Sequence, residues 1–138
     1  MQQIPLFDRP DLNIISQQKN ALHAAARACR LSREQILDRM NELASAHHIH
    51  LVSNGRLKMD TFEKWLNPNE KGRHMPMCAL PVFCAVVGEI SAINILALAV
   101  GAQVVGPEDL KLLKWAKAYF KARDARKEMR VIEGDLEL

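Results

Sequence analysis

The chain has 138 residues, which is the size of one ordinary domain with room for an appended segment. Apolar residues make up 49% and charged residues 25% of the sequence, and these ordinary values exclude wholesale disorder and a low-complexity tract. Nineteen Lys and Arg against sixteen Asp and Glu leave a formal charge of +3, a mild basic excess that permits a polyanionic partner without requiring one.

The cysteines and the apolar segments indicate in which cellular compartment the protein is expected. Cys29, Cys78 and Cys84 are an odd number without CxxC spacing, which argues against a disulfide scaffold and against a Cys-rich zinc site. The first ten residues lack the pattern of a secretory signal, and the most apolar window, residues 78–105, is interrupted by Pro, Gly and polar residues. We therefore expect a cytoplasmic protein without a membrane-spanning segment.

The N-terminal part of the chain predicts an arm followed by two helices. Residues 1–10 contain two prolines and predict an extended arm. The alanine-rich segment 11–30 has apolar residues at helical spacing and predicts the first helix. Ser32 and Gln35 have the spacing of a capping box, so the second helix is expected to begin there.

A connection and a short third helix follow. Residues 45–56 contain Asn54 and Gly55, a strong turn signal, and the segment is either a short hairpin or an irregular loop. Residues 57–66 predict a helix that places Phe62 and Trp65 on one face and ends at Asn67. The polar stretch that comes next predicts a surface loop.

Three further helices complete the expected architecture. The fourth helix is predicted over 77–87 and is ended by Gly88, and the fifth is predicted over 90–100 and is ended by Gly101. The sixth is predicted over 107–132, begins at a Gly-Pro pair and is expected to be ended by Gly134. The predicted fold class is all-α, a bundle of about five helices with a long C-terminal helix. The predicted organisation is an arm over 1–10, a helical domain over 11–105 and a C-terminal helix over 106–138.

The order of these segments resembles a known family. The text LSREQILDRM, the ending FEKWLNP, the basic loop after it and PVFCAVVG resemble lambda-repressor-like helix-turn-helix proteins, in particular small DNA-binding regulators of Mu-like prophages. The arrangement is also similar to the phage regulatory protein CII family. The resemblance covers residues 21–101, and it departs from the family at residues 45–57, which replace a short turn. It implies binding to double-stranded DNA, with the third helix as recognition helix.

The polar face of that helix supplies candidate DNA contacts. Side chains that could reach base edges in a major groove are Lys58, Asp60, Thr61 and Lys64. Side chains that could hold phosphates are Arg33, Arg56, Asn67, Lys71 and Arg73. An acid among phosphates is repelled, so Asp60 either accepts a hydrogen bond from a cytosine amine or pairs with Lys64. The alternative is that this face is merely solvated.

The last helix carries a wide aromatic stripe among many Lys and Arg residues. Three interpretations remain open: it packs on its own bundle, it follows DNA phosphates, or it forms a homodimer interface. The candidate dimerisation residues are Leu112, Trp115 and Tyr119.

No motif for catalysis or cofactor binding is found. His47, His48 and His50 cluster without HExxH spacing or paired cysteines, and the sequence has no GxSxG elbow and no Gly-rich phosphate loop. We expect no metal, no cofactor and no enzymatic activity. The predicted function is that of a homodimeric, sequence-specific DNA-binding regulator of phage or prophage transcription. The alternative is a protein–protein interaction module that works through its aromatic C-terminal helix without binding DNA.

Overall fold

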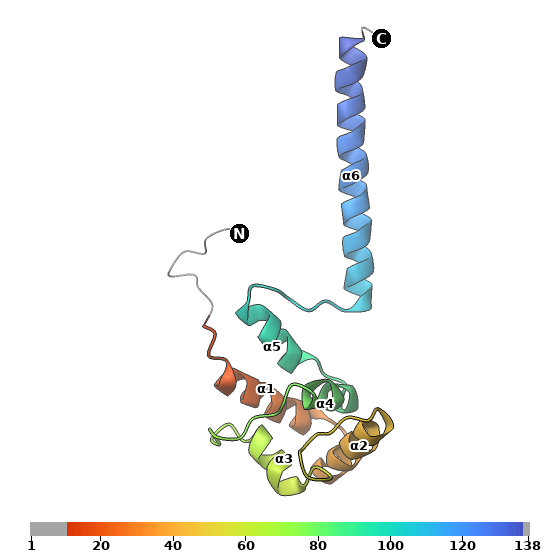
Figure 1. The fold of residues 1–138 in the computed structure, drawn as a ribbon. Coiled ribbons are helices and arrows are strands. Elements are labelled where there is room, and N and C mark those ends of the chain that lie inside the picture. The colour runs from red at the N-terminus through yellow and green to blue at the C-terminus, as the bar shows by residue number, and fades with distance from the viewer. Residues whose placement is uncertain (1–10, 137–138) are drawn as a thin grey trace. The chain divides into compact units, whose positions relative to one another are not determined.

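The computed structural model describes residues 11–136, and over this range the chain is all-α with no strand (Figure 1). The all-α prediction is confirmed; the arm predicted over 1–10 lies outside the described residues. The helices, in chain order, are α1 (Ile15–Ala28), α2 (Arg33–Ala46), α3 (Met59–Leu66), α4 (Ala79–Val87), α5 (Ser91–Ala99) and α6 (Pro107–Asp135).

The chain forms two compact units, Met1–Gln103 and Val104–Leu138. The first contains α1 to α5: α1 packs against α5 and α3, and α2 packs against α4 and α3. The hydrophobic core lies between these helices, and the centroids of the Phe62 ring on α3 and the Phe83 ring on α4 lie 6.3 Å apart. The largest fully buried side chains of this core are Phe62, Phe83, Leu22, Ile36, Met40 and Leu66.

Local sequence signals set several helix ends. The capping box of α2 is confirmed: the Gln35 backbone N–H donates to Ser32 Oγ at 3.2 Å, and the Ser32 N–H donates to Gln35 Oε1 at 2.9 Å. Gly88 ends α4 in the left-handed region at φ +72°, which a residue without Cβ adopts at little cost. The helix α3 ends before Asn67, as expected.

Two helix ends differ from the predictions by more than two residues. The helix α1 begins at Ile15 rather than at residue 11, because the Asn13 N–H donates to Asp11 Oδ1 at 2.9 Å and this local turn competes with helix. The helix α6 continues past Gly134 to Asp135. A glycine inside a helix costs only about 1 kcal/mol, so Gly134 does not by itself stop the last turn.

The connection between α2 and α3 is an irregular loop, not a hairpin. Leu51 and Leu57 are buried in the core, and Gly55 turns the chain at φ +79°. The buried side chain of Asn41 on α2 pairs with the backbone of Leu57: Asn41 Nδ2 donates to the Leu57 carbonyl and the Leu57 N–H donates to Asn41 Oδ1, both at 3.0 Å. One amide side chain thus satisfies the backbone groups that a hairpin partner would have bonded.

The end of α3 is held by a buried lysine of α1. Lys19 is 2% exposed, and its ammonium donates to the carbonyls of Lys64 at 2.9 Å, of Trp65 at 3.5 Å, and of Arg73 in the following loop. Burial lowers the pKa of Lys19, and the negative charge of Glu70 acts in the opposite direction. This cation satisfies carbonyls at the negative end of α3 and fixes the loop beyond it.

The second unit consists mainly of α6, none of whose residues is buried. None of the helices in residues 11–136 is long and apolar enough to cross a membrane.

Candidate nucleic-acid interface

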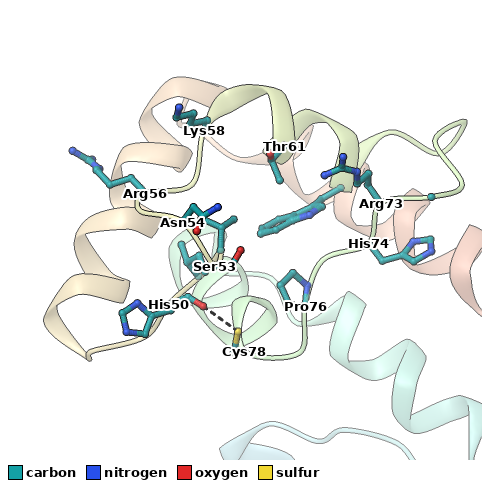
Figure 2. A pocket seen from close by; sticks show the side chains of 14 residues that line it. His50, Ser53, Asn54, Arg56, Lys58, Thr61, Arg73, His74, Pro76 and Cys78 are labelled. Carbon is teal, nitrogen blue, oxygen red and sulfur yellow. Dashed lines mark hydrogen bonds between the residues drawn. The ribbon is translucent and has the colours of Figure 1, made fainter.

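A basic groove of about 740 Å³ opens between three segments of the first unit: the loop over 47–58, the start of α3 and the loop that follows α3 (Figure 2). Three permanent cations line it, Arg56, Lys58 and Arg73, together with His50 and His74. No Asp or Glu is among its lining residues. We call this hollow the basic groove.

Hydrogen bonds from buried side chains fix the backbone beside each cation of the basic groove, while the basic side chains themselves are exposed. Arg56 and Lys58 flank Leu57, which is buried and bonded to Asn41, so both basic side chains are exposed. On the other side, the Arg73 carbonyl accepts from Lys19 while its side chain stays exposed. Figure 2 shows Arg56 and Lys58 along one rim, with Arg73 and His74 along the other. None of the three permanent cations forms an ion pair within the described part of the chain.

Polar and aromatic groups occupy the rest of the basic groove. Ser53, Asn54 and Thr61 supply hydroxyl and amide groups, and the largely buried Trp65 also lines the groove. The Cys78 thiol donates to the His50 carbonyl at a distance of 3.6 Å, so it links the chain before α4 to the loop over 47–58 (Figure 2). The groove therefore offers positive charge together with neutral donors and acceptors.

A smaller hollow of about 220 Å³ lies beside the same helix and carries both signs of charge. Arg33 Nη1 lies 2.7 Å from Glu63 Oε2, and Lys64 Nζ lies 3.2 Å from Asp60 Oδ2. The Arg33 guanidinium also lies 3.1 Å from His23 Nδ1. The cations of this second hollow are therefore already partnered by groups of the chain itself.

The candidate DNA contacts fall into two groups. Arg56, Lys58, Thr61 and Arg73 line the basic groove. Arg33, Asp60, Lys64 and Asn67 line the hollow with mixed charge. Lys71 is exposed and lines neither. Of the two alternatives for Asp60, the structure has the pairing with Lys64.

Several lining residues were not anticipated from the sequence. Ser53 and Asn54 belong to a segment whose path could not be inferred, because it follows no helical or strand period. His50 and His74 also line the groove, and both stand near basic residues in predicted loops. The signal that could have found His74 is the run Lys71 to His74, which holds three basic or titratable side chains in four residues.

Over residues 11–136, no three His, Cys, Asp or Glu side chains are placed to hold a metal ion. All three cysteines are free thiols: Cys84 is buried, Cys29 is half-buried and Cys78 is exposed. Burial raises the pKa of Cys84, which makes this thiol a poor nucleophile.

No protein-family model matches the sequence, and no curated protein or solved structure is significantly similar to it. The chemistry of the basic groove is therefore the basis on which a function is assigned.

Proposed function

We propose that the chain binds double-stranded DNA sequence-specifically, with α3 as recognition helix, and that it acts as a homodimeric regulator of phage or prophage transcription. The observation that carries this proposal is the basic groove. It places Arg56, Lys58 and Arg73 around one opening without a carboxylate, beside the start of a short helix that contributes Thr61 to the lining.

The phosphate contacts follow from the charges of the groove. Exposed cations without an acidic partner attract a polyanion, and each phosphate they neutralise releases a condensed counterion. To bind a phosphate, Arg33 would have to break its ion pair with Glu63, which reduces the free energy gained from the phosphate contact. We therefore assign the principal phosphate contacts to Arg56 and Arg73, and lesser ones to Arg33, Asn67 and Lys71.

Base reading is assigned to the start of α3. Recognition helices contact base edges mainly with residues near their N-terminus, and Lys58 and Thr61 lie there on the side of the basic groove. Asp60 and Lys64, paired on the other side, present an acceptor and a donor to base edges. The helix thereby offers groups for sequence choice, while the loops on either side offer charge.

Selection of bound fragments from a random duplex library, followed by affinity measurements at two salt concentrations, tests the proposal. Arg56→Ala and Arg73→Ala should each weaken binding to all duplexes and lower the slope of log affinity against log salt by about 1, because one phosphate contact is lost. Thr61→Ala should instead change which sequences are recovered.

Two arginines provide matched controls. Arg33→Ala should weaken binding less than Arg73→Ala, because Glu63 already offsets the Arg33 charge. Arg39 is exposed on α2 and lines a different hollow, so Arg39→Ala should leave binding unchanged. Equal losses for Arg39→Ala and Arg73→Ala, or no duplex binding at low salt, would contradict the proposal.

A protein-interaction module without DNA binding is the second candidate, and the exposed apolar side chains of α6 favour it. Leu112 and Trp115 are each 63% exposed, and Tyr119 is 47% exposed. Such residues at a helix surface are typical of an interface. Under the DNA-binding proposal the same face serves the homodimer, so the duplex-binding measurement decides between the two candidates.

A further inference from the structure

A second apolar pattern runs along α6 and shares only Trp115 with the candidate dimerisation residues. The residues of this pattern alternate at spacings of three and four, which is the a/d pattern of a coiled coil. They are Trp115, Ala118, Ala122, Ala125, Met129, Ile132 and Leu136, and we call them the seam. Leu112 and Tyr119 lie beside the seam rather than in it.

The seam is uncovered over its whole length. Met129 is 58% exposed, Ile132 is 49% exposed and Leu136 is 63% exposed, and the three alanines are exposed as well. Helices in proteins owe most of their stability to the packing of an apolar face, and this helix of 29 residues has no buried side chain. A heptad seam is best covered by a second helix of matching period.

From the seam and the charges beside it, we infer that α6 pairs with α6 of a second copy of this chain as an antiparallel coiled coil. This inference rests on the homodimer of the proposed function but not on DNA binding. The occupant of the seam from Trp115 to Ile132 is the same stretch of the seam in the partner, related by a two-fold axis between residues 122 and 125.

The sizes of the seam residues favour the antiparallel direction. About this axis Trp115 faces the partner's Ile132, Ala118 faces the partner's Met129, and Ala122 faces the partner's Ala125. Each Ala–Met layer then combines a small residue with a large one, which fills space evenly. A parallel pair would instead place Trp115 against the partner's Trp115, followed by three layers of alanine alone.

The charges beside the seam favour the same direction. In the antiparallel pair Lys121 lies beside the partner's Glu128, and Lys114 lies beside the partner's Asp135, so both flanking contacts are attractive. In a parallel pair Lys121 would lie beside the partner's Arg126, and Glu128 beside the partner's Glu133. Both of these contacts are repulsive, which selects against the parallel arrangement.

Charge reversal in the full chain, without DNA, tests the direction. Lys121→Glu and Glu128→Lys should each raise the dimer dissociation constant, measured by sedimentation equilibrium at low salt, by about tenfold, because two symmetry-related attractions become repulsions. The double variant should restore the wild-type constant. Lys127→Glu and Asp124→Lys make the same charge changes away from the seam and should leave the constant unchanged.

Each contrary outcome has a definite meaning. If both single reversals tighten the dimer, the helices are parallel, and the antiparallel inference fails while the homodimer stands. A monomer at every concentration would overturn both the seam pairing and the homodimer. Equal effects of the seam-flanking and control variants would show that net charge, not pairing, governs association and would also overturn the inference. Failure of the DNA-binding proposal is seen separately, as an intact dimer that binds no duplex.

Discussion

The side chain of Asn41 makes the two backbone hydrogen bonds that a second strand would have made with Leu57. This side chain is buried in the core and makes two hydrogen bonds with the backbone of one residue sixteen positions later. A buried polar side chain is stabilising only when its donors and acceptors are satisfied, and here they satisfy the backbone in return. The position of Leu57, and with it that of its two basic neighbours, depends on this one amide.

We expect Asn41→Ala to lower the free energy of unfolding by about 2–4 kcal/mol, because the buried N–H and carbonyl of Leu57 lose their partners. Urea denaturation followed by circular dichroism measures the loss. Glu42→Ala, at the exposed neighbouring position, is the control and should change stability by less than about 0.5 kcal/mol. An equal effect of the two substitutions would show that the Asn41 bonds are not stabilising.

Sequence reasoning found contacts between residues close along the chain and missed the distant ones. The Ser32–Gln35 capping box and the Asp60–Lys64 pair are separated by three and four residues, a spacing at which helix geometry brings side chains together. The contact of Arg33 with Glu63 spans thirty residues, and that of Lys19 with Arg73 spans fifty-four. Such contacts depend on how helices pack, which a hydrophobic period alone does not specify.

At the scale of elements, α3 is the shortest of the six described helices and carries the proposed base contacts. Eight residues are too few for a stable helix in water, so α3 depends on tertiary contacts. Phe62, Trp65 and Leu66 bury its inner face, and the ammonium of Lys19 binds the carbonyls at its end.

We expect Lys19→Met to lower the free energy of unfolding by about 2–3 kcal/mol, because the carbonyls at the end of α3 lose their donor even though a buried charge is also removed. Urea denaturation measures this value. Gln17→Met, at an exposed position of α1, should have little effect. A Lys19→Met variant as stable as the wild type would mean that desolvation of the ammonium cancels its hydrogen bonds.

All six helices could be predicted at their centres, because apolar period and propensity extend over many residues there. The start of α1 and the end of α6 could not be predicted. An Asx turn at Asp11 and a single glycine at 134 are weak local signals beside the helix-forming residues that adjoin them. Of the residues that line the basic groove, Arg56, Lys58, Thr61 and Arg73 could be predicted from the sequence as candidate DNA contacts. The path of the loop over 47–58, which brings Ser53 and Asn54 into the groove, could not be predicted, because it is set by Asn41 and by two buried leucines.

At the scale of the whole molecule, the core and the proposed self-association surface belong to different units. Every buried apolar residue in the described chain lies between Leu22 and Ala92, within the first unit. The helix α6 contributes none. The stability of the first unit is therefore expected to be independent of the second.

A chain that ends at Gln103 should keep the urea midpoint of the full chain, measured by tryptophan fluorescence of Trp65, because the core around that ring is unchanged. It should also sediment as a monomer, because the seam has been removed. Refolding of the shortened chain to a lower midpoint would show that α6 supports the first unit.

A buried polar side chain holds the backbone of each rim of the basic groove. The Asn41 amide binds the backbone of Leu57 on one side, and the Lys19 ammonium binds the carbonyl of Arg73 on the other. The distance between the rims is consequently set when the chain folds, so under the DNA-binding proposal little ordering would remain for the step of duplex binding. Removing either the Asn41 amide or the Lys19 ammonium would then weaken the proposed binding without removing any of the exposed cations of the groove.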